Sequence, residues 1–173
     1  MRAGIVGFAI VALAGVGAAQ PGGFTSDEGG YSVKFPGAPK VTEKTANTGV
    51  GELKVTVATY ANPDGSVFMV SFTDFPEAAT KPDNHATLLD GIRDGVVKGR
   101  DGKVVGDEKN GKFGPDKLPG REFTVDKDKG KQRIKFRVVV RDGRVYQLAA
   151  IGTPEFANGK DATAFLESFE LNK

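Results

Sequence analysis

A row of basic residues between positions 131 and 144 is the clearest local sign of binding chemistry in this sequence. The row consists of Arg133, Lys135, Arg137 and Arg141. Apolar residues fill the even positions from 134 to 140. Because successive side chains of a β-strand point to opposite faces, a strand here carries its cations on one face. The pattern predicts a surface that binds an anionic partner, such as an acidic protein, lipid headgroups or an anionic polysaccharide.

The same row also fits an ordinary solvent-facing sheet surface. Glu122 and Asp126 lie on the strand expected next to it, from where their carboxylates can pair with the cations. In that case the charges stabilise the sheet and bind no partner. Both interpretations stay open from the sequence.

Residues that commonly carry catalysis or bind metals form no motif in this sequence. There is no cysteine, which excludes thiol catalysis, disulfides and thiolate zinc sites. His85 is the only histidine, and we interpret it as a surface or capping residue because a closed zinc site needs three or four ligands. Neither a GxSxG elbow nor a phosphate-binding glycine loop occurs. We therefore expect no catalytic residue, no metal site and no cofactor.

Abundant carboxylates leave one enzymatic alternative open. Asp74 with Glu77 and Asp126 with Asp128 are acids close in sequence, and paired acids can cleave glycosidic bonds. Most of these acids fall in expected turns or helix caps, where Asp is favoured for backbone hydrogen bonding alone. The alternative to a binding function is therefore a cofactor-independent hydrolase that uses carboxylates.

Residues 1–19 have the pattern of a secretory signal peptide. Arg2 precedes an apolar run over residues 3–16, and small residues follow up to Ala19, after which we expect cleavage. An uncleaved anchor is the alternative, but the run falls short of the roughly 20 strongly apolar residues of a spanning helix. The sequence thus predicts an exported protein, periplasmic or secreted, without a transmembrane segment after cleavage.

Composition and charge point to an ordinary folded domain without a nucleic-acid partner. Hydrophobic residues make up 39% of the chain and charged residues 27%, which is typical of globular proteins. Loss of Arg2 lowers the formal net charge from +2 to +1. A nearly neutral protein has no overall field that attracts nucleic acid.

The periodicity of the chain defines the elements that must position these residues. Residues 20–30 are Gly-rich and polar, and we expect a flexible lead-in there, followed by one domain over residues 31–173. Alternating patterns predict strands over residues 31–35, 41–47, 52–61, 66–74, 104–109, 121–126, 131–141 and 144–151. The expected core includes Phe35, Phe72, Phe136, Leu148 and Phe169.

Two segments have helical spacing. Apolar residues at 88, 89, 92, 96 and 97 predict an amphipathic helix with Asp83 or Asn84 as its cap and Gly99 just past its end. Gly91 and Gly95 each cost this helix about 1 kcal/mol relative to Ala, so packing on the sheet must stabilise it. A second, short helix is expected after a cap at Asp161.

Five segments of this sequence together carry a resemblance to a known family. They read YSVKFPGAPK at 31–40, LDGIRDG at 89–95, LPGREF at 118–123, GRVYQL at 143–148 and FLESFEL at 165–171. The set resembles PsbP-like domains of exported bacterial proteins, whose fold is shared with a Ran-binding nuclear-import regulator. The resemblance implies a single-domain α+β fold, an α/β/α sandwich whose central, mainly antiparallel sheet has about six to seven strands. It implies no activity, because this architecture serves unrelated roles. We interpret the chain as a non-catalytic binding or accessory domain of the cell envelope.

Overall fold

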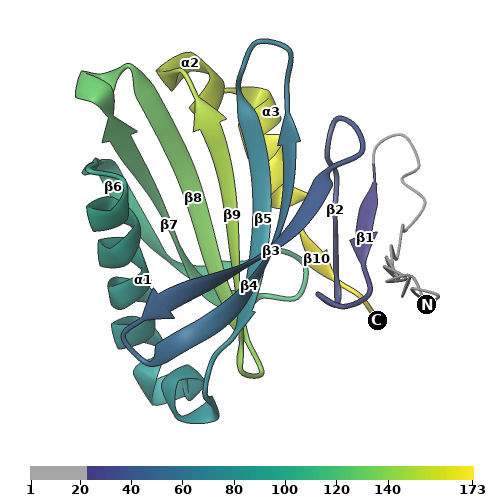
Figure 1. Ribbon diagram of the computed structural model, residues 1–173, viewed down its shortest axis with the longest axis vertical. Coiled ribbons are helices and arrows are strands. Elements are labelled where there is room, and N and C mark those ends of the chain that lie inside the picture. The colour runs from purple at the N-terminus through teal and green to yellow at the C-terminus, as the bar shows by residue number, and fades with distance from the viewer. Residues whose placement is uncertain (1–22) are drawn as a thin grey trace, which may run out of the picture.

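Seven antiparallel strands pair into the central sheet, in the order β3-β4-β5-β9-β8-β7-β6 (Figure 1). The computed structural model describes residues 23–173, so the expected signal peptide lies outside the described residues. The strands are β3 (Lys40–Thr48), β4 (Gly51–Ala61), β5 (Val67–Asp74), β6 (Lys103–Phe113), β7 (Leu118–Lys127), β8 (Gln132–Arg141) and β9 (Arg144–Gly152). The expected α+β domain with six to seven antiparallel strands is confirmed.

Tight turns whose residues were predicted from the sequence close two of the hairpins. Gly65 between β4 and β5 has a φ of 85°, and Gly143 between β8 and β9 has a φ of 84°. Side chains with a Cβ rarely adopt this left-handed conformation. These glycines let consecutive strands become neighbours, as β4 with β5 and β8 with β9.

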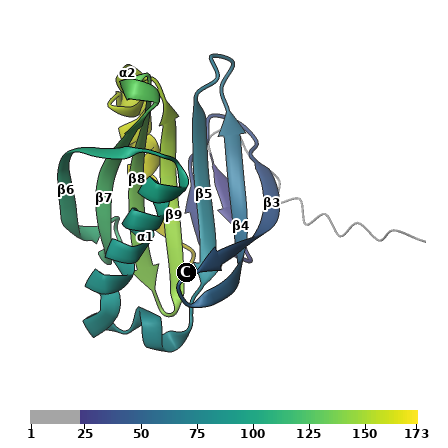
Figure 2. The ribbon, with the colours of Figure 1, turned by 60° about the vertical axis from the view of Figure 1, so that its left-hand side comes forward.

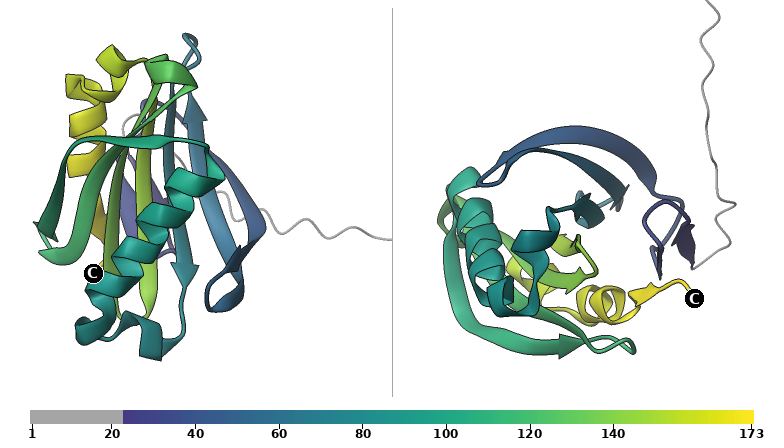
Figure 3. Two further views of the ribbon diagram at one scale, coloured as in Figure 1. Left: turned by 90° about the vertical axis from the view of Figure 1, so that its left-hand side faces the viewer. Right: turned by 90° about the horizontal axis from the view of Figure 1, so that it is seen from below.

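Helix α1 (His85–Gly99) covers one face of the sheet. Leu89 packs there with the stacked rings of Phe123 and Phe136, and all three side chains are buried. The sheet is strongly curved, and the β3–β4 hairpin and β6 both bend towards the side on which α1 lies (Figures 2 and 3). As a result, α1 has part of the sheet on either side of it.

A small second sheet and two helices cover the opposite face. These elements are β1 (Phe24–Ser26), β2 (Tyr31–Val33), β10 (Glu170–Leu171), α2 (Pro154–Ala157) and α3 (Lys160–Glu167), with β2 in the middle of the small sheet. Three short 3-10 helices complete the fold at Glu77–Thr80, Pro82–Asn84 and Asp128–Gly130. An aromatic cluster fills this side, where Tyr31 stacks on Phe169. All five residues expected in the core are buried.

The start of the fold differs from the sequence prediction. Part of the expected flexible lead-in forms β1, which pairs with β2 and places Phe24 opposite Val33. The Phe24 ring packs edge-on against Phe35, with 5.8 Å between the ring centroids. Burial of this aromatic side chain compensates for ordering a Gly-rich segment.

The expected helix ends also need correction. Asn84 occupies the N-cap position of α1, but its side chain donates to the carbonyl oxygen of Ala78 at 2.7 Å and caps no helix N–H. Gly99 is the last residue of α1, and Gly159, not Asp161, precedes α3. Within residues 23–173, none of the helices is long and apolar enough to cross a membrane.

Candidate binding groove

The basic row lies on the face of β8 opposite α1, and most of it is engaged in ion pairs. Arg133 makes two hydrogen bonds to Asp126, at 2.6 and 2.8 Å. Arg137 makes two to Glu122, at 2.8 and 3.1 Å, and the Lys135 ammonium lies 3.7 Å from the same carboxylate. The pairing across strands that the sequence left open is therefore present.

Two members of the row differ in how firmly they are held. Arg137 also donates to the carbonyl oxygen of Leu166 in α3 at 2.8 Å, and its side chain is only 11% exposed. Arg141 pairs with Asp142 in its own turn, and its side chain is 50% exposed. Arg137 thus holds α3 on the sheet, whereas Arg141 faces solvent. That the row binds a partner stays a prediction.

Asp74 and Asp126, two of the acids considered for catalysis, are paired with arginines, as is Asp90 of α1. Asp74, Asp90 and Asp126 each accept a hydrogen bond from an arginine, which lowers the pKa of each carboxyl below its usual value. A general acid in glycoside hydrolysis needs a raised pKa, so that it still holds a proton near neutral pH. The arrangement therefore does not favour a hydrolase.

His85 is tied to the backbone beside it. Its Nε2 lies 2.7 Å from the carbonyl oxygen of Thr80, to which it donates. Within residues 23–173, no three His, Asp or Glu side chains come together in a way that would hold a metal ion. Through this hydrogen bond, His85 connects the start of α1 to the end of the 3-10 helix Glu77–Thr80.

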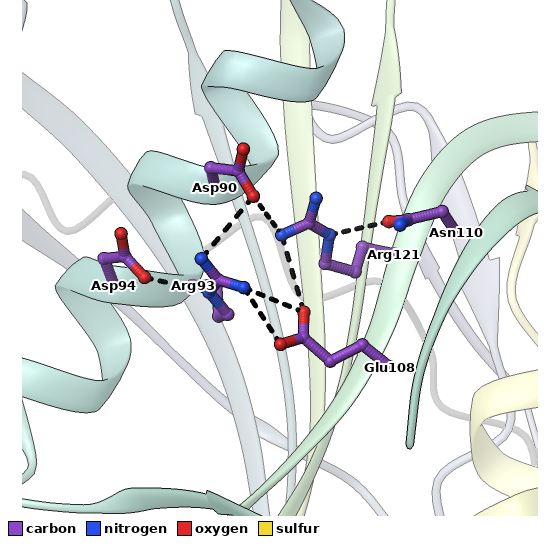
Figure 4. A network of polar contacts seen from close by, with 6 residues as sticks. All are labelled: Asp90, Arg93, Asp94, Glu108, Asn110 and Arg121. Atoms are coloured by element: carbon purple, nitrogen blue, oxygen red, sulfur yellow. Dashed lines mark hydrogen bonds and ion pairs between the residues drawn. The ribbon is translucent and has the colours of Figure 1, made fainter.

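A buried arginine fixes one side of α1 to the sheet (Figure 4). Arg121 of β7, whose side chain is 7% exposed, donates to Asp90 of α1 at 2.5 Å and to Asn110 of β6 at 2.7 Å. Arg93 of α1 binds Glu108 of β6 at 2.9 Å. Sequence reasoning missed this network, because Arg121 and Asp90 lie on different elements, 31 residues apart.

On its other side, α1 borders a large groove. Its walls are α1 and the tip of the β3–β4 hairpin at residues 47–50, with Gln147 of β9 and Phe75 also lining it. The groove, which we call the α1 groove, has a volume of about 920 Å³. Leu88, Ile92 and Val96 give it an apolar wall. Sites for small molecules usually measure roughly 300–1,000 Å³ and have mainly apolar walls.

Three glycines keep the α1 groove open. Gly91, Gly95 and Gly99 follow one another at intervals of four residues, so they lie along one side of α1, and all three line the groove. A Cβ atom added at any of them would meet no other atom within 4 Å. Packing against the protein therefore does not require these glycines, and larger side chains here would project into the groove.

Comparison with solved structures identifies the fold. The solution structure of cyanobacterial PsbP (CyanoP) from Synechocystis sp. PCC 6803 matches with a TM-score of 0.61 at 10% sequence identity, over 90% of this chain and 96% of that one. A crystal structure from Bacteroides thetaiotaomicron VPI-5482 matches with a TM-score of 0.49 at 14% identity, over 90% and 50% of the two chains. No family model and no curated protein matches the sequence. The likeness shows the fold alone.

Proposed function

We propose that this chain, which has the PsbP-like fold, is a non-catalytic accessory domain that binds an apolar ligand in the α1 groove. The observation that carries the proposal is the groove itself, a mainly apolar groove of about 920 Å³ along a side of α1 that carries three glycines. Its size and apolar walls are those of small-molecule sites.

The energetics of α1 support a role for the open groove. Each glycine inside a helix costs about 1 kcal/mol relative to alanine, and Gly91 and Gly95 both lie inside α1. Alanine would fit at both positions without contact. Gly91 and Gly95 thus lower the stability of α1, although no neighbouring atom requires glycine at either position. Such a cost is expected where a bound ligand needs the space.

Binding in the α1 groove is tested with N-phenyl-1-naphthylamine, an uncharged dye whose fluorescence rises in apolar surroundings. The wild-type protein should bind it saturably. Gly95→Leu should reduce the affinity at least tenfold, because the new side chain projects into the groove. Ala86→Leu is the matched control, since Ala86 is exposed, lies two and a half turns from Gly95 and so on the opposite side of α1, and does not line the groove.

Three results would contradict this proposal. The first is a wild-type protein that does not bind the dye. The second is a Gly95→Leu variant that folds, as shown by its circular dichroism spectrum, and binds the dye as tightly as the wild type does. Equal losses in Gly95→Leu and Ala86→Leu would also contradict it, because the dye would then bind elsewhere on α1.

We also propose that the domain acts in the cell envelope after export. The support is the pattern of residues 1–19, with Arg2 before an apolar run and small residues before Gln20. N-terminal sequencing of protein from an envelope fraction should return Gln20 as the first residue. A sequence that begins at Met1 would show that the segment is retained.

A further inference from the structure

We infer that the α1 groove takes a long-chain fatty acid whose carboxylate pairs with Arg100, an inference that rests on the proposed function. Arg100 directly follows α1 and lines the groove beyond Gly99. The groove thus has an apolar wall along the helix and a cation at the C-terminal end of that helix. This is the arrangement that suits a chain with one anionic end.

Arg100 differs from the other arginines of residues 23–173. The other six all lie within 4.0 Å of a carboxylate oxygen; they are Arg93, Arg121, Arg133, Arg137, Arg141 and Arg144. For Arg100, the described part of the chain supplies no such carboxylate. Its guanidinium lies 5.6 Å from the ring centroid of Phe136, as a cation over an aromatic face.

The surroundings of Arg100 leave its charge poorly solvated. Its side chain is half-buried, and burial lowers the pKa of the guanidinium below its usual value, although arginine stays charged in proteins. A partly buried charge without a counter-ion costs free energy, which an anionic ligand would recover. Charge complementarity therefore favours an anion at this end of the groove.

The length of the groove and the single positive charge of Arg100 indicate the chemical class of the ligand. The α1 positions that line it run from Thr87 to Gly99, roughly 20 Å along the helix, which suits an extended alkyl chain. A guanidinium can hold a carboxylate through two parallel N–H bonds. One arginine balances the single charge of a carboxylate, whereas a phosphate monoester carries a charge of about −1.5 to −2. By charge, a fatty acid therefore fits better than a lipid phosphate monoester.

The test compares two ligands of equal chain length, oleate and oleyl alcohol, by their displacement of N-phenyl-1-naphthylamine. The wild type should bind oleate about tenfold or more tightly than the alcohol, because a hydrogen bond to a charged group adds to the affinity. Arg100→Gln should remove this preference, so that the ratio of the affinities for oleate and for the alcohol falls to nearly one. Arg100→Lys should keep part of it, since the charge remains. Lys98→Gln, which changes an exposed cation of α1 that does not line the groove, should behave like the wild type.

The outcomes separate this inference from the proposed function. If the wild type binds the dye but binds oleate and the alcohol equally, the inference is wrong while the proposed function stands. The inference is also wrong if Arg100→Gln and Lys98→Gln weaken oleate binding to the same extent, which would indicate attraction by overall charge. If oleyl phosphate binds more tightly than oleate, the inference of a carboxylate is wrong and the ligand is a lipid phosphate. If the dye does not bind at all, both proposals fail.

Discussion

Arg137 shows how one side chain of the basic row connects three parts of the fold. Its guanidinium bonds to Glu122 of β7 and to the last turn of α3, and it also lies 4.9 Å from the ring centroid of Phe113. These contacts leave it little freedom to meet a partner. Within the row, the exposed Arg141 is the residue best placed to do so.

Arg137→Gln should therefore lower the free energy of unfolding by roughly 1.5–3 kcal/mol, because hydrogen bonds to charged groups are lost and Glu122 is left with only Lys135 nearby. Arg141→Gln should change it by less than about 0.5 kcal/mol, since exposed ion pairs contribute little. Urea unfolding of both variants measures the difference. If both variants lose an equally small amount of unfolding free energy, the contacts of the Arg137 side chain do not stabilise the protein in solution.

Whether the basic row binds an anionic partner can be tested without unfolding the domain. Arg141→Gln should keep the fold, so a partner recovered from an envelope extract by the wild type should be lost with this variant if the prediction holds. The interaction should also weaken as salt rises, because exposed charges are screened over about 8–10 Å. Unchanged recovery with Arg141→Gln would count against the row as a binding surface.

At the scale of elements, α1 is held on two sides and open on the third. Leu89 packs into the core on the sheet, and the Arg121 network fixes the helix to β6 and β7. The remaining side carries the glycines and borders the groove. This arrangement keeps the helix in place without filling the space next to the β3–β4 hairpin.

Gly91→Ala and Gly95→Ala should each stabilise the protein by about 0.5–1 kcal/mol, because alanine favours the helix and its Cβ meets no other atom. Gly120→Ala is the opposite case and should destabilise it, since a Cβ there would collide with the carbonyl oxygen of Val138. Thermal unfolding of the three variants checks both directions. A loss of stability in Gly95→Ala would mean that the groove is closed over the glycines.

Elements with strong periodicity were predictable from the sequence, whereas β1 and β10 were not. The alternation over residues 52–61 and the helical spacing over residues 88–97 correspond to β4 and α1. The short strand β2 was predictable because its alternation continues to Phe35, whereas β1 and β10 have three and two residues and no alternating apolar pattern extends beyond them. They form because each of them pairs with one edge of β2, and because aromatic side chains such as Phe24 pack there.

At the scale of the whole molecule, the groove arises from the curvature of the sheet. The hairpin tip at residues 47–50 and the helix side at residues 87–99 are separate in the sequence, and bending of the sheet brings the β3–β4 hairpin towards α1 (Figure 2). Sequence reasoning noted Gly91 and Gly95 only as a cost to the helix. The sequence does not show the path of the β3–β4 hairpin. It therefore could not place these two glycines opposite a second wall of a groove.

The predicted basic row and the observed α1 groove lie on opposite faces of the sheet. Side-chain alternation along β8 was read correctly, with the cations opposite the face that carries Phe136 and α1. Glu122 and Asp126 were expected as possible partners of the row, but which cation each of them faces depended on the register between β7 and β8, in which Glu122 faces Arg137 and Asp126 faces Arg133. Strand register is set by the whole sheet, so the pattern of one strand could not decide it.

Amide chemical-shift mapping of the 15N-labelled protein with N-phenyl-1-naphthylamine tests the central claim, binding in the α1 groove, most directly. If the dye binds in the groove, the largest shifts should fall on both of its walls, at Gly91, Gly95 and Gly99 and at residues 48–50, while the amides of Arg133 and Lys135 barely change. Shifts that gather on the outer face of β7 and β8, or saturating dye with no shifts along α1, would contradict it.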